Sequence, residues 1–398
     1  MHQLPNDTIA VTLPDFGQSM TVLGDPGLAT DDWGGNDALT AAISSLNSNV
    51  TLVGEDLVAM HGNSHGGNDS LLVSVDGGWD SAVAVGDAQS MADNSQGGND
   101  TLNVDAHNSL YTNVYLYGDV QGDMSGNAGG GNDTLTASTG WRSFGSLSGD
   151  AGGAMSGNAH GGNDTLSATD YGINGGGDAL SGDAIGAMTD NAVGGNDILT
   201  FAASSDAQLG GGSLSGDSGT SMSDNAQGGN DILTAVVDGE RAAFSTTLYG
   251  DAPTMSGNAH GGNDILTGGS SPDRLAGDAM SYAPSSPGSI TGGTDTLNGG
   301  AGNDLLWGGP NNDTFVFNTG SGQDIINDFN QGNQAVGSTT TEHDLINLHD
   351  YGFADWAAVS SLIGDNSAGD AVIHLTANDT ITLDGVHTAA LHPTDFVI

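Results

Sequence analysis

Aspartates recur along this chain at nearly fixed spacing, each at the end of a short glycine-rich phrase. Eight copies of the phrase read Gly-Gly-Asn-Asp, and a ninth reads Gly-Gly-Thr-Asp. Successive copies lie 31 to 34 residues apart, a regularity that is typical of a repeat architecture. The nine aspartates are Asp37, Asp69, Asp100, Asp133, Asp164, Asp197, Asp231, Asp264 and Asp295.

A second acidic series runs in step with the first, in a Gly-Asp element whose acid lies 12 to 17 residues before the aspartate of the phrase. It starts at Asp25, and Asp56 is a Gly-Glu-Asp variant. A third series places an asparagine six residues before each aspartate of the phrase, from Asn63 to Asn258. Each unit therefore brings two carboxylates with it, and we expect both to be metal ligands. The second set of candidate ligands is Asp87, Asp119, Asp150, Asp183, Asp217, Asp251 and Asp278.

The composition indicates which metal these carboxylates would bind. The chain has 49 acidic residues against 3 basic ones, and all the acids except Glu55, Glu240 and Glu342 are aspartate. Aspartate beside glycine and asparagine suits tight turns that present carboxylate and carbonyl oxygens, the ligands that hard cations prefer. We therefore expect several Ca²⁺ ions.

The same composition excludes other kinds of site. The chain has no cysteine, so disulfides, thiolate metal sites and a cysteine nucleophile are impossible. It also lacks the His-Glu-x-x-His sequence of zinc metalloproteases. With a net charge of −46, the chain should not bind nucleic acid or anionic lipid. No stretch of 18 apolar residues occurs, so we expect no insertion into a membrane.

The pattern of apolar residues predicts which secondary-structure elements position these aspartates. A leucine stands two residues after every aspartate of the phrase, from Leu39 to Leu297, as expected if one apolar side chain points inward in each unit. We interpret each unit as strand, turn, strand and loop. Units of this kind stack in parallel, about 4.8 Å apart, into an all-β, right-handed parallel β-solenoid.

Such stacking places the carboxylates in columns. Two carboxylates about 4.8 Å apart repel by roughly 0.9 kcal/mol in bulk water and by about 3.5 kcal/mol at an effective dielectric of about 20. Summed along a column, this repulsion competes with the whole stability of a typical domain, about 5–15 kcal/mol. Bound Ca²⁺ between the coils would reverse its sign, so we expect calcium to switch folding on.

The glycines and asparagines of the phrase have a predicted role as well. Consecutive turn positions at positive φ are cheap only for glycine, with asparagine as the best substitute. We therefore expect the glycines of each phrase, and the asparagine that precedes its aspartate, to adopt positive φ and to point carbonyl oxygens at a shared centre.

Near the C-terminal end the spacing of the aspartates tightens to nine residues. Residues 299–307, Gly-Gly-Ala-Gly-Asn-Asp-Leu-Leu-Trp, match the nonapeptide G-G-x-G-x-D-x-U-x, residues 308–313 match it with one substitution, and residues 268–275 are a looser copy. This stretch resembles the RTX family of calcium-binding β-rolls, or hemolysin-type repeats. The resemblance implies that turn carbonyls and aspartates hold Ca²⁺ jointly with the next coil. It nominates Asp264, Asp273, Asp295, Asp304 and Asp313 as ligands.

The repeat sequence ends at Asp313. We therefore divide the chain into residues 1–313, the calcium-binding solenoid with nonapeptides from about residue 264, and residues 314–398, a β-rich cap with one short helix near residues 353–363. This last region resembles the C-terminal segment of type I secreted proteins of Gram-negative bacteria. The resemblance implies export by type I secretion machinery and an extracellular or cell-surface location. The absence of an N-terminal signal pattern before Leu13 agrees with that route.

The repeats begin by Asp25 and continue to the cap, so we expect the solenoid itself to be the functional part, and not an enzyme. The leading hypothesis is a secreted structural protein that assembles as a homo-oligomer, matrix, surface layer or fibre. The alternative is a calcium-dependent adhesin or binding module that acts as a monomer. Membrane permeabilisation is disfavoured because amphipathic apolar stretches are lacking, and an isolated enzyme ranks last.

Two further residue types recur with the repeat. Histidines precede the phrase at His65, His160 and His260, and we expect solvent-facing side chains there and not zinc ligands. Methionines recur in the loop of each unit, and we expect them to pack inside it. These are Met91, Met124, Met155, Met188, Met222 and Met255.

Overall fold

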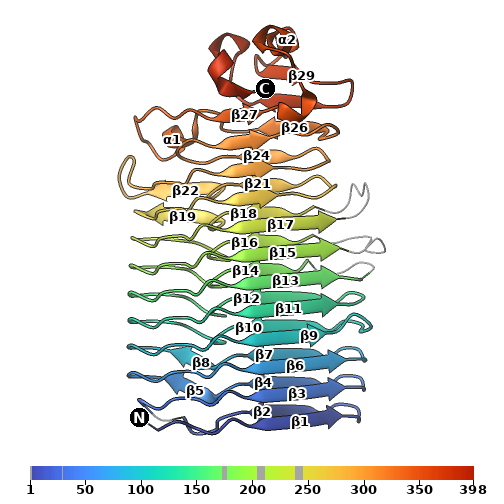
Figure 1. Ribbon diagram of the computed structural model, residues 1–398, viewed down its shortest axis with the longest axis vertical. Coiled ribbons are helices and arrows are strands. Elements are labelled where there is room, and N and C mark those ends of the chain that lie inside the picture. Colours follow the sequence, from blue (N-terminus) through green and yellow to red (C-terminus); the bar gives the residue numbers. More distant parts are fainter. Residues whose placement is uncertain (1, 29, 173–176, 204–210, 238–244) are drawn as a thin grey trace.

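The computed structural model describes residues 2–28, 30–172, 177–203, 211–237 and 245–398. Within these residues the chain winds into a tall stack of coils, and each coil adds one strand to each of two long parallel sheets (Figure 1). The predicted all-β solenoid is confirmed.

The first sheet has 13 strands, all paired in parallel. In spatial order they are β1 (Thr8–Leu13), β3 (Ala38–Ile43), β6 (Ser70–Val75), β9 (Thr101–Asp105), β11 (Thr134–Thr139), β13 (Thr165–Asp170), β15 (Ile198–Ala203), β17 (Ile232–Val237), β20 (Ile265–Thr267), β23 (Thr296–Asn298), β25 (Thr314–Val316), β27 (Leu345–Asn347) and β31 (Phe396–Val397).

The second sheet has 14 strands and turns antiparallel only at its C-terminal end. In spatial order they are β2 (Ser19–Leu23), β4 (Asn49–Val53), β7 (Ser81–Val85), β10 (Asn113–Tyr117), β12 (Phe144–Ser148), β14 (Ala179–Ser181), β16 (Ser213–Ser215), β18 (Thr247–Tyr249), β21 (Arg274–Ala276), β24 (Leu305–Trp307), β26 (Gln323–Ile326), β30 (Thr380–Leu383), β29 (Ala371–His374) and β28 (Ile363–Asp365).

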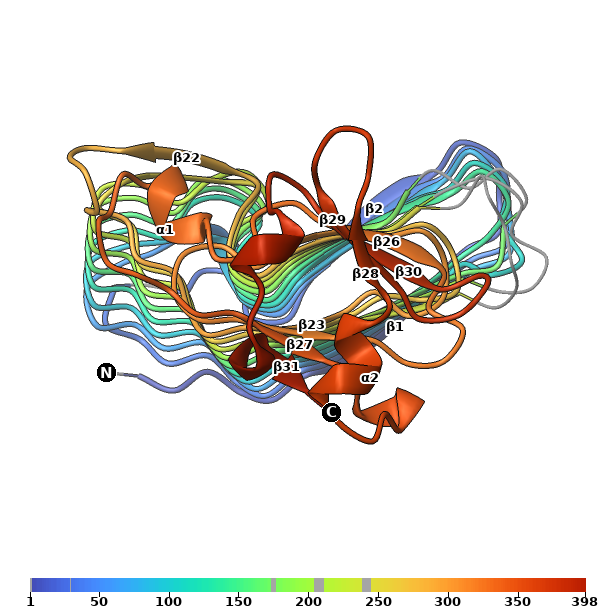
Figure 2. The same cartoon turned by 90° about the horizontal axis from the view of Figure 1, so that it is seen from above.

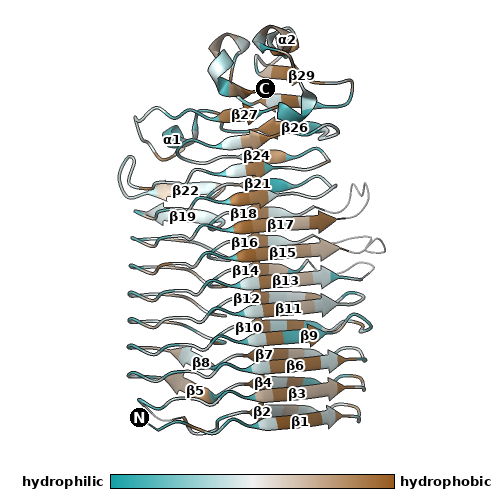
Figure 3. Cartoon of the chain, viewed as in Figure 1, coloured by the Kyte–Doolittle hydropathy of each residue, from teal (hydrophilic) through white to brown (hydrophobic). Residues whose placement is uncertain are grey.

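The two sheets face each other across the main hydrophobic core. In β13 buried residues alternate with exposed or half-buried ones, the pattern of a strand with one face inward. Leu166 pairs with Leu135 in the coil before it and Leu199 in the coil after it, and every leucine of this series is buried, as predicted. Figure 3 shows the hydrophobic bands along the stacked strands. Each such leucine contributes roughly 1.5–3 kcal/mol by burial.

The loop that joins each second-sheet strand to the next phrase forms a second lobe, seen in Figure 2 beside the paired sheets. Methionines of successive loops pair coil by coil, as Met124, Met155 and Met188 do, and they form a separate core with a column of alanines. The predicted packing of the methionines is confirmed. The lobe carries two short strand pairs, β5 (Asp56–Met60) with β8 (Ala88–Met91) and β19 (Thr254–Gly257) with β22 (Ser281–Pro284).

The glycines of the long units do not have the predicted conformation. None of the glycines in the Gly-Gly-Asn-Asp phrases has a left-handed φ, and neither do the asparagines that follow them. They are glycine because successive coils touch: a Cβ at Gly162 would lie 1.3 Å from the carbonyl oxygen of Gly131. Among the turns that carry the metal-binding motifs, positive φ occurs in the nonapeptides, at Gly300 (86°), Gly309 (96°) and Asn311 (93°).

At the C-terminal end both sheets continue beyond the last repeat. Strands β25, β26 and β27 extend them past residue 313, and the antiparallel strands β28 and β29 close the second sheet. In β30, Ile381 and Leu383 alternate inward as predicted. The region has two short α-helices, α1 (Gly332–Ala335) and α2 (Trp356–Ser360), and single 3₁₀ turns at His349–Tyr351, Thr388–Ala390 and Pro393–Asp395. Helix α2 lies in the predicted segment, whereas α1 was not predicted.

None of the helices in the described part of the chain has the length and apolarity needed to cross a bilayer.

Candidate metal centre

The aspartates of the repeated phrase form one continuous column, which we name the strand column because each precedes a strand of the first sheet. The backbone N–H of each donates a hydrogen bond of 2.6 to 3.0 Å to Oδ1 of the corresponding aspartate in the next coil. The column contains the nine predicted aspartates, then Asp313 and finally Asp344. The nonapeptide Asp313 therefore continues the series of the long repeats.

The acids of the Gly-Asp element form a second column, named here the loop column. Each accepts a hydrogen bond from the backbone N–H of the second glycine in its own unit's phrase, as in Gly195 N to Asp183 Oδ1 at 2.8 Å. All seven predicted members lie in it, together with Asp25. In the second coil the structure corrects the prediction: Glu55 occupies the column, where it accepts from Gly67 N, and Asp56 begins β5 outside it.

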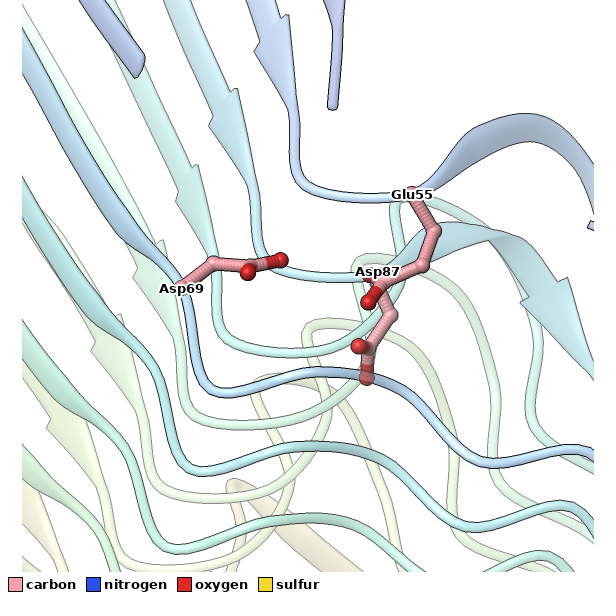
Figure 4. A group of neighbouring side chains, drawn as sticks. All are labelled: Glu55, Asp69 and Asp87. Atoms are coloured by element: carbon pink, nitrogen blue, oxygen red, sulfur yellow. The ribbon is translucent and has the colours of Figure 1, made fainter. Parts of the chain in front are cut away.

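The two columns face each other inside the wall of the solenoid. Ligand oxygens of Glu55, Asp69 and Asp87 all lie within 4.8 Å of one another, and so do those of Asp87, Asp100 and Asp119 (Figure 4 shows the first group). Each group takes one residue from the strand column and two from successive coils of the loop column. All these residues are buried, and among the described residues no arginine nitrogen lies within 4.0 Å of them.

One oxygen of nearly every carboxylate in this wall has no hydrogen-bond partner. In the strand column this is Oδ2 of every member from Asp37 to Asp313. In the loop column it includes Asp183 Oδ2 and Asp217 Oδ2. A buried, unpaired and ionised carboxylate oxygen is among the most costly groups a protein can hold, so these oxygens require either a bound cation or a proton.

Backbone carbonyls complete the set of oxygen ligands. A Cβ built on Gly86 would lie 1.7 Å from the carbonyl oxygen of Gly118 and 1.9 Å from Asp100 Oδ2. The glycine before each loop-column acid is thus required by the space that these oxygens share. Carboxylate and carbonyl oxygens with no nitrogen or sulfur among them are the ligand chemistry of Ca²⁺.

Burial and mutual repulsion also shift the protonation of these groups. Desolvation, with the charges of its neighbours, raises the pKa of Asp69 to about 8. Burial raises the pKa values of Glu55, Asp100 and Asp119 well above their ordinary range, and the neighbouring carboxylates add to the shift. Without a cation, the buried wall therefore retains protons at neutral pH.

The remaining two predicted ligands lie on the opposite side of the solenoid, in the turns that enter the second sheet. There Thr246 N donates to Asp273 Oδ1 at 2.8 Å, Asp273 N to Asp304 Oδ1 at 2.8 Å, and Asp304 N to Asp324 Oδ1 at 3.0 Å. We name this series the turn column. Oδ2 of Asp304 and of Asp324 is buried without a partner. The five aspartates nominated from the nonapeptides are thus divided between two columns, with Asp264, Asp295 and Asp313 in the strand column.

Comparison with known families agrees with this geometry. The family model of the RTX calcium-binding nonapeptide repeat matches four copies, over residues 258–279 and 289–326. The chain carries RTX calcium-binding repeats. RTX nonapeptide repeats bind Ca²⁺, and the RTX β-solenoid is a structural calcium-binding fold. No curated protein matches the chain.

Some members of the columns were not predicted as ligands. Glu55, Asp324 and Asp344 belong to them, and isolated acids occupy earlier positions of the turn column at Asp80 and Asp178. Asp324 and Asp344 share a signal with the repeats, because each is followed two residues later by an isoleucine that points into the core. The histidines of the phrase take no part in the columns: His160 and His260 are exposed and His65 is half-buried.

Proposed function

We propose that this chain is a secreted structural protein whose solenoid folds when it meets extracellular Ca²⁺ and then self-associates into a surface layer, matrix or fibre. Calcium would be held along residues 1–313 by the strand, loop and turn columns. Residues 314–398 would cap the roll and carry the signal for type I export from a Gram-negative bacterium, and no part of the chain would be an enzyme.

One observation carries this proposal: the continuous series of buried carboxylate oxygens without partners in the strand column. Each long unit contributes one acid to the strand column and one to the loop column, so one divalent cation per unit would balance their charge. In the RTX nonapeptides the same kind of oxygen set binds Ca²⁺, and the long units present it without the nonapeptide sequence. The metal would supply a positive charge at each coil boundary, and the acids hold it there.

Calcium titration of metal-free protein, followed by far-ultraviolet circular dichroism, tests the calcium part of the proposal. We expect a transition from coil to β structure. The variant Asp164→Asn removes one charge from the middle of the strand column. It should shift the midpoint to a calcium concentration at least about tenfold higher, which corresponds to a loss of about 1.4 kcal/mol in binding free energy. Asp384→Asn removes the same charge from an exposed position and should leave the midpoint unchanged. Full β structure in the presence of chelator at pH 8 and low ionic strength would contradict the proposal.

Electron microscopy of negatively stained samples, with and without calcium, tests assembly. Ordered polymers that form only with calcium support the structural role. Monomers that persist in saturating calcium would instead favour a binding module.

A further inference from the structure

The turns that join the first sheet to the second lie at the right of Figure 1, and in the first five coils they carry exposed apolar side chains. Trp79 is 58% exposed, Trp141 41% and Phe16 74%. Leu46, Leu110 and Trp141 occupy the same position in successive coils, where they pair through isolated bridges that also include Gly78. We name this surface the apolar ridge; it consists of Phe16, Leu46, Trp79, Leu110, Tyr111 and Trp141.

The backbone of these turns makes large side chains costly. The corresponding positions of five successive coils all have left-handed φ: Gly17 (73°), Asn47 (57°), Trp79 (57°), Tyr111 (55°) and Arg142 (54°). This conformation costs about 1–2 kcal/mol for most residues and nothing for the glycine of the first coil. Tryptophan, tyrosine and arginine at these positions therefore reduce the stability of the fold, and such a cost persists where a surface has a function.

The ridge side chains hold one another in place. The rings of Trp79 and Tyr111 stack with centroids 5.2 Å apart and planes 6° apart, and the Tyr111 and Trp141 rings are 6.2 Å apart. The Arg142 guanidinium lies 5.6 Å from the Tyr111 ring and 5.5 Å from the Trp141 ring, and its Nη1 donates to the Tyr111 hydroxyl at 2.7 Å. The exposed Trp79, Trp141 and Arg142 and the half-buried Tyr111 are of the residue types that dominate binding energy at protein interfaces.

Charges around the ridge are unevenly placed. Among the described residues, no carboxylate oxygen lies within 4.0 Å of the Arg142 guanidinium, although the chain carries 49 acids. A hollow of about 240 Å³ lies beside the middle coils of the ridge, and Asp76, Asp105 and His107 line it together with Ala42 and Ile43. Within the described part of the chain, Arg142 thus has no acidic partner at the C-terminal end of the ridge, while Asp76 lies in the acidic hollow two coils before it.

We propose that the apolar ridge binds the same ridge of a second copy of this chain in antiparallel orientation. A two-fold axis near Tyr111 would place Arg142, one coil beyond it, opposite Asp76, one coil before it, and the symmetry would make this contact twice. Parallel pairing would instead set Arg142 against Arg142. The inference rests on the self-association in the proposed function and assigns one contact of that assembly, a closed two-fold pair, to this surface.

The size of the ridge agrees with a reversible contact. Five coils are separated by four steps of about 4.8 Å, which gives a length of roughly 20 Å and suits an interface at the small end of the range for specific complexes. The net charge of −46 opposes any pairing of copies, and bound Ca²⁺ lowers this charge. We therefore expect the dimer only in the calcium-loaded protein.

Sedimentation velocity of the full chain in saturating calcium tests the interface, with circular dichroism on the same samples to confirm folding. The double variant Trp79→Ser, Trp141→Ser should weaken the dimer at least about tenfold. A matched control, Leu57→Ser with Val58→Ser, removes exposed apolar side chains from β5 in the other lobe and should leave the dimer unchanged.

Charge exchange tests the orientation. Arg142→Glu should weaken the dimer because the new carboxylate faces Asp76, and adding Asp76→Arg in the same chain should restore it, since both contacts are then reversed. A wild-type chain that folds with calcium but remains monomeric, or a dimer of unchanged strength in the double tryptophan variant, would overturn the interface and leave calcium-driven folding intact. A chain that does not fold with calcium would overturn the proposed function instead.

Discussion

At the scale of single residues, glycine has a role in this wall that differs from its usual role in turns. The glycines of the long units allow successive backbones to approach, so that carbonyl and carboxylate oxygens of two coils share one space. Gly162 is such a residue: its missing Cβ would meet the Gly131 carbonyl carbon at 2.5 Å as well as its oxygen. Because the obstacle is backbone, a rotamer change cannot relieve it.

This role predicts the effect of Gly162→Ala. We expect the variant to lose at least about 3 kcal/mol of stability in saturating calcium, the upper part of the range for overpacking. Urea unfolding measures the loss. Gly364→Ala is the control, because nothing lies within 4 Å of the Cβ it would add, and it should stay within about 0.5 kcal/mol of the wild type. Equal stabilities of the two variants would show that the coils are not in contact at Gly162.

At the scale of elements, the first sheet was predictable from the sequence, while the lobe was not. Leu166 and its counterparts repeat with the phrase and must point inward, so strand and stacking follow from periodicity alone. The recurrence of Met155 and its counterparts predicted packing within the loop, but no local pattern shows that the loops of successive coils form a core separate from that of the sheets. The choice of Glu55 over Asp56 is similar, because only the side chain's reach to Gly67 N settles which acid enters the column.

The lobe also positions the metal site, since the segment that follows each acid of the loop column enters the lobe. Met155→Ala should cost about 2–5 kcal/mol, the range for removing a large buried side chain, because Met124 and Met188 hold the adjacent coils and limit collapse of the cavity. Urea unfolding in saturating calcium measures this. Met20→Ala removes the same side chain from an exposed position in β2 and should cost under about 1 kcal/mol. A small effect at Met155 would mean that the lobe is loosely packed.

At the scale of the whole molecule, protons and Ca²⁺ offer two ways to neutralise the same columns. Burial and the neighbouring carboxylates raise the pKa of Asp304 to about 8 and of Asp313 to about 9, from an ordinary value of 3.8. At a pH between the ordinary pKa of 3.8 and these raised values, the folded, metal-free chain binds more protons than the unfolded chain. Its free energy of unfolding must therefore fall as the pH rises from about 4 to about 9.

We accordingly expect the metal-free chain to gain β structure when a chelator-treated sample is brought from pH 8 to about pH 4.5, as measured by circular dichroism. Lower net charge alone would also favour compaction, and salt separates the two causes. High sodium chloride at pH 8 screens repulsion between exposed charges but does not relieve the desolvation of buried carboxylates, so it should not restore the fold. If salt at pH 8 were as effective as acid, the general polyanion charge, and not the buried columns, would control folding.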